Sequence, residues 1–236
     1  MEKAQKIAND LFKFTNAKSI FLYGSRARDD FYERSDYEIG VLMEREKYIG
    51  RAEIKKQFNI EEINIFPFYK EDFIVFKPDT PFQKSIYMRE IIKAGKTLAG
   101  EKIIENLQPP EIKLLDIIQD IRFNLGYALA ATHSYRNNDN ITASLHFEKS
   151  CLFGTRDYII FKMNQFLISF DDIVDASSKL DLQEYQELPE YAAKLRRKEV
   201  DIDTQKLFSN ISYLNKFIED EVTAVFKENG NIVLIK

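Results

Sequence analysis

The sequence predicts an α+β protein, in which a mixed β-sheet with helices on one face precedes an all-α helical bundle. Short apolar runs alternate with helical patterns over residues 1–108, which is typical of a small mixed sheet with helices. Two adjacent prolines, Pro109 and Pro110, then interrupt any helix. From residue 111 onward, apolar residues recur at spacings of three and four, which predicts helices. We therefore expect two domains, an α/β domain at 1–108 and a helical domain at 109–236.

The elements of the first domain follow from local patterns. Ile7, Leu11 and Phe14 stand at helical spacing and predict a first helix. Pro67 is expected to end a strand, because proline cannot donate to a sheet. Gly95 is expected to cap a helix. In order, we predict a helix at about 3–14, a strand at 19–23, a short helical or looped segment at 26–28, a strand at 37–43, a helix at 52–58, a strand at 60–66 and a helix at 82–93.

The second domain is predicted as an up-and-down bundle of about four to five helices. An apolar stripe begins at Ile112 and continues to Leu125, and a polar turn at 137–140 ends that first helix. A long apolar segment at 141–170 predicts a central helix. Shorter helices are expected at 172–185 and 188–198, followed by an amphipathic helix over 207–225 and a small terminal strand at 232–235.

Composition limits the classes of function. Hydrophobic residues make up 44% of the 236 positions, which is enough for a packed core and argues against disorder. The net charge of −4 argues against a broad nucleic-acid-binding surface and suits a cationic small molecule. The apolar runs are too short for a membrane helix, and the first residues lack an apolar signal core. A single cysteine, Cys151, excludes an internal disulfide, so we expect a cytoplasmic protein.

The most informative segment covers residues 19–43. An apolar run at 19–23 leads into Gly24-Ser25, which opens a turn with exposed backbone N–H groups. Asp36 follows eleven residues after Ser25, and Glu38 begins a second apolar run. Since strand side chains alternate, Asp36 and Glu38 point to the same face. Two carboxylates beside a Gly-Ser turn can hold a divalent metal and the phosphates of a nucleoside triphosphate, although a solvated strand start gives the same pattern.

This pattern carries a family resemblance. Gly-Ser, ten residues and then Asp-x-Asp/Glu resembles the signature of the DNA polymerase β-like nucleotidyltransferase superfamily, and with Tyr23 and Ser35 it looks most like the kanamycin (aminoglycoside) nucleotidyltransferases. The resemblance implies an Mg²⁺-dependent enzyme that transfers a nucleoside monophosphate from a nucleoside triphosphate, ATP being the expected donor, to a hydroxyl of a small acceptor such as an aminoglycoside-like antibiotic. It also implies a homodimer contact in the helical half.

The resemblance also implies roles for particular residues. Asp36 and Glu38 would act as metal ligands. Gly24 would let the triphosphate approach the backbone, and Ser25 would donate its hydroxyl to a phosphate oxygen. Arg26 and Arg28 would contact the triphosphate. Taken individually, Gly24 is equally an ordinary turn residue, and each arginine is equally a surface residue.

The superfamily uses a third carboxylate on a neighbouring strand, as metal ligand or base. Glu62 matches that position, and Glu61 is its alternative, because a one-residue change of register turns the other side chain inward. Asn64 shares the face of Glu62 but cannot act as a base. A solvated strand end is the other interpretation of Glu62.

Aminoglycoside enzymes of this kind take a general base from the first long helix of the second domain. The matching stretch, residues 119–129, contains no glutamate. Asp120 is the nearest carboxylate and the candidate base, with an exposed helix position as the alternative. This departure from the family pattern puts aminoglycoside activity in question more than nucleotide binding.

Two other classes remain open at the level of sequence. Nucleotidyltransferase domains also pair with helical HEPN domains in toxin–antitoxin systems, where they modify a protein. The HEPN motif is Arg, four to six intervening residues and then His, and the separations from Arg122 to His133 and from Arg136 to His146 are longer. The third class is a non-catalytic nucleotide-binding homologue that kept the fold without the base.

Overall fold

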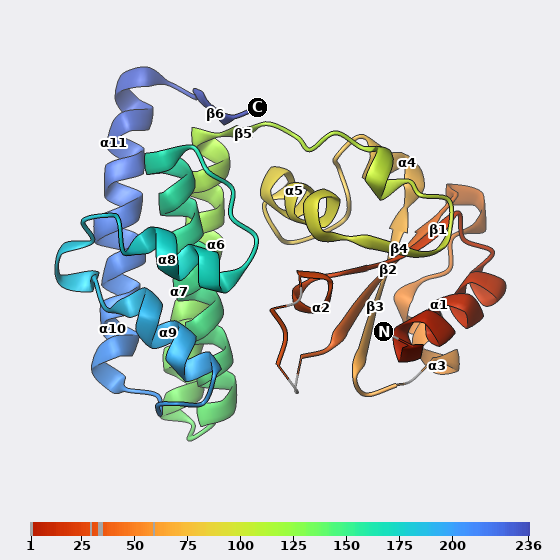
Figure 1. Ribbon diagram of the computed structural model, residues 1–236, viewed down its shortest axis with the longest axis horizontal. Coiled ribbons are helices and arrows are strands. Elements are labelled where there is room, and N and C mark those ends of the chain that lie inside the picture. The colour runs from red at the N-terminus through yellow and green to blue at the C-terminus, as the bar shows by residue number, and fades with distance from the viewer. Residues whose placement is uncertain (1, 29, 33–34, 59) are drawn as a thin grey trace. The chain divides into compact units, whose positions relative to one another are not determined.

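The computed structural model describes residues 2–28, 30–32, 35–58 and 60–236 (Figure 1). The chain forms two compact units, Met1–Pro110 and Glu111–Lys236. Each unit has its own buried core and is described by itself. An N-terminal mixed sheet with helices, followed by a largely helical region, confirms the predicted α+β class.

The first unit is built on a four-stranded mixed sheet. Its strands are β1 (Ser19–Tyr23), β2 (Tyr37–Met43), β3 (Ile63–Tyr69) and β4 (Lys96–Gly100), in the order β3-β2-β1-β4. β1 runs antiparallel to β2 and β4, whereas β2 and β3 are parallel. All five residues of the central strand β1 are buried, as its unbroken apolar run indicates.

Helices cover both faces of this sheet, so the expectation of helices on one face is wrong (Figure 1). The reason is the strand period of two, which sends alternate side chains of β1 to opposite faces. The helices are α1 (Glu2–Thr15), α2 (Ser25–Arg28), α3 (Arg51–Gln57), α4 (Lys70–Ile74) and α5 (Lys84–Ala94), with 3-10 turns at Arg45–Lys47 and Ile104–Asn106. Ile20 and Leu22 pack with Leu11 of α1 and Ile54 of α3. Phe21 packs among residues that include Phe73 of α4 and Met88 and Ile91 of α5.

Two strand predictions need correction. Pro67 does not end β3, which continues to Tyr69 and begins at Ile63 rather than at residue 60. β3 is an edge strand, paired through Val41 opposite Pro67, and an edge strand tolerates a residue that cannot donate on its open side. Strand β4 was not predicted, because its sequence, Lys96 to Gly100, has no apolar run and its residues are only partly buried.

The second unit is a helical bundle with a small two-stranded sheet. Its helices are α6 (Leu114–Arg136), α7 (Asn140–Met163), α8 (Phe170–Ser177), α9 (Leu188–Arg196), α10 (Thr204–Ser212) and α11 (Asp220–Asn229), with a 3-10 turn at Gln183–Tyr185 and a π-helical segment at Tyr213–Glu219 that joins α10 to α11. β5 (Ile112–Lys113) pairs antiparallel with β6 (Val233–Ile235). The region is therefore not purely helical: Ile112 belongs to a strand rather than to the apolar stripe of a helix.

Helix α7 is the most buried helix of this unit, and it ends earlier than predicted. Its last residue is Met163 rather than Phe170. Asn164 adopts a left-handed conformation with φ of 54°, and its N–H donates to the carbonyl oxygen of Ile160. This capping geometry explains why the apolar pattern overestimates the length of the helix. Within the described residues, neither α7 nor any other helix is long and apolar enough to cross a membrane.

Strands β1 and β2 are closely packed in the middle of the first unit's sheet. Gly40 of β2 lies opposite Phe21 of β1, and the Phe21 ring occupies the space over Gly40. A Cβ atom on Gly40 would lie 2.1 Å from the Phe21 Cζ atom. Phe21 is fully buried against Phe68 and Phe73, so it has little room to move.

We predict that Gly40→Ala lowers the free energy of unfolding by about 1–3 kcal/mol, because the added methyl group overpacks the core against Phe21. Urea-induced unfolding, followed by circular dichroism, measures the change. Gly126→Ala is the matched contrast: Gly126 is exposed within α6 and has no atom near its missing Cβ, so that variant should be neutral or more stable. Equal losses of stability in both variants would contradict the packing described for Phe21.

Candidate active site

The pairing of β1 with β2 brings the Gly-Ser turn to the carboxylates. In this antiparallel register Tyr23, the last residue of β1, lies opposite Glu38. Gly24 follows with φ of +71°, and a Cβ atom on it would lie 1.7 Å from Oε2 of Glu38. The Glu38 carboxylate therefore lies directly over the Gly24 backbone. Only glycine combines this backbone conformation with the space that Glu38 occupies.

The turn continues into the short helix α2. The backbone N–H groups of Ala27 and Arg28 donate to the carbonyl oxygen of Gly24, at 3.0 and 3.2 Å. Ser25, the first residue of α2, is half-buried, and Ala27 is buried beneath the turn. These contacts hold Gly24-Ser25 as an ordered element at the end of β1, beside the Glu38 carboxylate.

Asp36 lies immediately before β2 and is exposed. The side-chain amide of Asn64 donates to Oδ2 of Asp36 at 2.9 Å. Asn64 belongs to β3 and stands beside Glu38 in the parallel register, so its side chain shares the face of Glu38. The structure thus gathers Asp36, Glu38 and Asn64 at one edge of the sheet, next to the Gly24 turn.

The predicted third carboxylate, Glu62, is not part of this group. Glu62 lies in the turn before β3, with its side chain 64% exposed, and forms an ion pair with Lys3 of α1. The hydrogen bond from Lys3 lowers the pKa of Glu62. The described residues contain no cluster of three or more His, Cys, Asp or Glu side chains placed to hold a metal ion. Within the described residues, Asp36, Glu38 and Glu62 therefore do not form a three-carboxylate site: Glu62 pairs with Lys3, and Asn64 donates to Asp36.

Arg26 and Arg28 contact residues between α2 and β2, Ser35 and Asp30 respectively. The Arg28 side chain is 4% exposed and forms ion pairs with Asp30, at 3.1 Å, and with Glu90 of α5. Burial lowers the pKa of Arg28, but Glu90 and Asp30 outweigh it and raise that pKa above its ordinary value. The Arg28 guanidinium is thus held in a buried network of ion pairs.

Arg26 is also engaged with its own segment. Its guanidinium lies over the rings of Phe31 and Tyr37, at 4.6 and 4.2 Å from their centroids. Its Nε–H donates to the carbonyl oxygen of Ser35 at 2.8 Å. In this conformation Arg26 anchors the residue that precedes Asp36.

An aromatic group lies beside the Gly24 turn, and local sequence patterns did not reveal it. The Tyr87 hydroxyl donates to the Tyr23 hydroxyl at 3.1 Å, across 64 residues of sequence. Burial is the main cause that raises the pKa of both hydroxyls, and the nearby Glu38 carboxylate raises both further. The Tyr23 ring also contacts Phe66 of β3, and Phe82 stacks on Tyr87 at 5.1 Å. Both hydroxyls therefore stay protonated beside Glu38.

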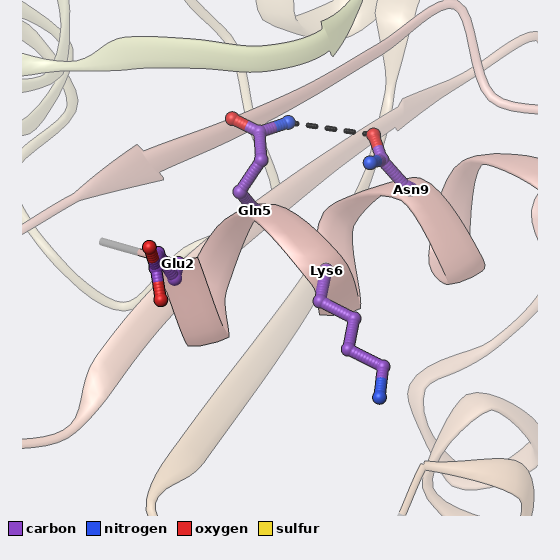
Figure 2. Close-up of a pocket in the computed structure, with 4 residues that line it drawn as sticks. All are labelled: Glu2, Gln5, Lys6 and Asn9. Atoms are coloured by element: carbon purple, nitrogen blue, oxygen red, sulfur yellow. Dashed lines mark hydrogen bonds between the residues drawn. The ribbon is translucent and has the colours of Figure 1, made fainter.

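A shallow hollow on α1 is not the functional site. It is lined by Glu2, Gln5, Lys6 and Asn9, and Figure 2 shows the Gln5 side chain donating to Asn9 at 3.3 Å. Gln5 also donates to the carbonyl oxygen of Leu98. All four lining residues come from one exposed helix surface, and none belongs to the group around Gly24.

In the second unit, the candidate base Asp120 is buried rather than exposed on its helix. Its exposed fraction is 5%. The Asp120 carboxylate accepts a hydrogen bond from Asn124 at 3.3 Å and forms an ion pair with Arg156 at 3.8 Å. Asp157 lies beside it, and burial, followed by repulsion from Asp120, raises the pKa of Asp157 well above its ordinary value. This cluster is a buried carboxyl pair between α6 and α7, and its geometry does not support a role for Asp120 as general base.

Comparisons with known proteins agree with this geometry. Residues 5–103 match the model of the family described as polymerase beta, nucleotidyltransferase. These residues lie within the N-terminal unit and make up less than half of the chain. The matched stretch contains the Gly24 turn, the carboxylates of Asp36 and Glu38, and Asn64, and it excludes the helical unit.

A solved structure extends the likeness to the fold of both units. The crystal structure of spectinomycin adenyltransferase AAD(9) from Enterococcus faecialis, with ATP and spectinomycin, matches with a TM-score of 0.55 at 14% sequence identity. The match covers 91% of this chain and 96% of that one. At this identity the likeness concerns the fold alone. No curated protein sequence matches the chain.

We predict that Gly24→Ala lowers the free energy of unfolding by about 1–3 kcal/mol, because the new Cβ is strained at positive φ and collides with Glu38. In a Glu38→Ala background the same substitution should cost less, about 1 kcal/mol, since only the backbone strain remains. Urea unfolding of all four proteins of this double-mutant cycle measures the coupling. An equal cost in both backgrounds would show that the Glu38 side chain does not lie over Gly24.

A second prediction concerns Asp157. The pKa of Asp157 is raised in the folded protein. Between the ordinary pKa of 3.8 and the folded-state pKa, the folded protein therefore holds a proton that the unfolded chain has released. The free energy of unfolding consequently falls as the pH rises through this range. Asp157→Asn should remove this slope and stabilise the protein at neutral pH by on the order of 1 kcal/mol. Unfolding free energies at about pH 5 and about pH 8 measure it. Asp171→Asn, at a carboxylate that is 85% exposed, is the control. A slope that persists in Asp157→Asn would rule out a buried proton at this site.

Proposed function

We propose that the protein is a nucleotidyltransferase that moves a nucleoside monophosphate from a nucleoside triphosphate, with ATP as the donor, to a hydroxyl group of a small acceptor. The observation that carries this proposal is the placement of Glu38 over the Gly24 backbone, with Asp36 beside it. It brings a backbone turn and two carboxylates together within the stretch that matches the polymerase β nucleotidyltransferase family. Either feature by itself would be an ordinary turn or an ordinary strand end.

The donor set around Gly24 fits Mg²⁺. Magnesium is usually held in such enzymes by one or two carboxylates together with phosphate oxygens, rather than by a complete protein cage. Asp36 and Glu38 supply these two carboxylates, and the absence of a third one from the described group is compatible with this mode of binding. When bound, the ion neutralises phosphate charge and stabilises the charge that develops during transfer.

The remaining residues of the group would position the reactants. Gly24, without a side chain, leaves room for the Glu38 carboxylate against the turn, and the Ser25 hydroxyl can donate to a phosphate oxygen. Asn64 holds the Asp36 carboxylate in place through its 2.9 Å hydrogen bond. In the reaction, the acceptor oxygen forms a bond to the α-phosphorus, the bond to pyrophosphate breaks, and the hydroxyl proton leaves the acceptor.

We propose an aminoglycoside-like antibiotic as the acceptor class. Two observations support it: the match in fold to an enzyme solved with ATP and spectinomycin, and the net charge of −4, which suits a cationic acceptor. Because Asp120 is buried and paired, we assign the proton acceptor to no residue of α6. To test this class, the protein is incubated with ATP, Mg²⁺ and candidate acceptors that include spectinomycin and kanamycin, and the release of pyrophosphate is measured.

We predict that Asp36→Asn abolishes Mg²⁺-dependent binding of ATP and lowers turnover by on the order of 100-fold or more, because it removes one ligand charge. Isothermal titration of the purified protein with each nucleoside triphosphate, with and without Mg²⁺, measures binding. Asp72→Asn is the control, since Asp72 is a half-exposed carboxylate of the same unit that pairs with Arg45.

Wild-type protein that binds no nucleoside triphosphate in the presence of Mg²⁺ would overturn the proposed function. Binding that both aspartate variants retain equally would place the metal elsewhere. Tight Mg²⁺-dependent ATP binding without pyrophosphate release for any acceptor would instead favour a non-catalytic nucleotide-binding protein.

A further inference from the structure

The site described above carries negative charge that a bound triphosphate would increase. Asp36 and Glu38 contribute two carboxylates, and a nucleoside triphosphate adds several negative oxygens. Protein cations normally share the neutralisation with the metal ion. The two arginines of α2 already have partners. Arg28 pairs with Asp30 and Glu90, and Arg26 lies over two aromatic rings and donates to the carbonyl oxygen of Ser35. Further positive charge can come from another element.

Arg51, the first residue of α3, lies at the edge of the carboxylate group. Its guanidinium lies over the Phe66 ring, 4.5 Å from the centroid. Its terminal nitrogen is 3.4 Å from Oδ1 of Asn64, while the other end of the same amide donates to Asp36. Arg51, Asn64 and Asp36 thus form a chain of polar contacts from α3 to the first carboxylate.

Two features keep this guanidinium available. Arg51 is exposed, and within residues 2–28, 30–32, 35–58 and 60–236 no carboxylate forms an ion pair with it. The Phe66 ring orients its planar face, which leaves donors at its edge for a planar or tetrahedral anion. Its charge also reaches the interior of the site, since Arg51 acts to lower the pKa of the buried Tyr23 hydroxyl against the dominant effect of burial.

We propose that Arg51 binds the phosphate chain of the nucleoside triphosphate through charge-assisted hydrogen bonds, with Phe66 orienting it and Asn64 linking it to Asp36. This inference rests on the proposed nucleotidyltransferase function and adds a specific residue to it. An arginine fits this role better than a lysine, because its fork of donors can contact two phosphate oxygens at once. Arg51 would contribute affinity for the phosphates and none for the nucleoside.

The test compares phosphate-dependent with nucleoside-dependent binding. Arg51→Gln removes the charge but keeps a side chain that can contact Asn64 and Phe66. We expect it to weaken Mg²⁺–ATP binding by about 10- to 100-fold in isothermal titration, and to change adenosine binding by less than about twofold. Arg51→Lys should give an intermediate loss, because it keeps the charge and loses the fork.

Arg45→Gln is the matched control. Arg45 is also exposed and lies over an aromatic ring, that of Tyr69 at 4.2 Å, but its charge is paired with Asp72. It should bind Mg²⁺–ATP as the wild type does. Thermal unfolding of each variant establishes that it is folded. Should Arg51→Gln fail to fold, the ATP affinity of Arg51→Lys decides: a loss supports the proposal, and wild-type affinity overturns it.

The outcomes separate the two proposals. If the wild type and Arg51→Gln bind Mg²⁺–ATP equally well and Asp36→Asn does not bind it, the role of Arg51 is overturned and the proposed function stays intact. Wild-type protein without affinity for any nucleoside triphosphate would remove the proposed function, and the role of Arg51 with it. Equal losses for ATP and adenosine in Arg51→Gln would show a structural effect and also contradict the proposal.

Discussion

The candidate site depends on one constraint, the antiparallel register that sets Tyr23 of β1 opposite Glu38 of β2. It places the Glu38 carboxylate over Gly24 so closely that no side chain fits there. The parallel register of β2 with β3 then brings Asn64 beside Glu38 and within hydrogen-bonding distance of Asp36. A shift of one residue in the first pairing would send Glu38 to the opposite face and dissolve the site. The buried core on both faces of β1 prevents that shift.

Local patterns predicted the parts of the site that lie on one segment. The apolar run at 19–23, the Gly-Ser turn and the alternation of Asp36 and Glu38 are all encoded within about two dozen residues, and strand period alone relates the two carboxylates. The sequence could not show that Asn64 rather than Glu62 meets Asp36, because that choice depends on the start of β3 and on Lys3, far away in the chain. Likewise, the partly polar edge strand β4 lacks any apolar signal.

Local sequence also does not show which partners the charged residues have in the fold. The sequence predicts Arg28 as a phosphate ligand and Asp120 as a base, yet both side chains are buried with partners from other helices, Glu90 and Arg156. Such ion pairs join residues tens of positions apart, and burial makes their partners obligatory. Arg51 is the reverse case: nothing in its local sequence marks it, but the fold sets its exposed charge beside Asn64 and Phe66.

The most direct test of the central claim is a crystal structure of the protein with Mg²⁺ and a non-hydrolysable ATP analogue. The register of β1 and β2 predicts phosphate oxygens against the Gly24-Ser25 backbone and a metal ion bound by Asp36 and Glu38. A nucleotide bound away from this turn, or a metal ion held without either carboxylate, would contradict the account.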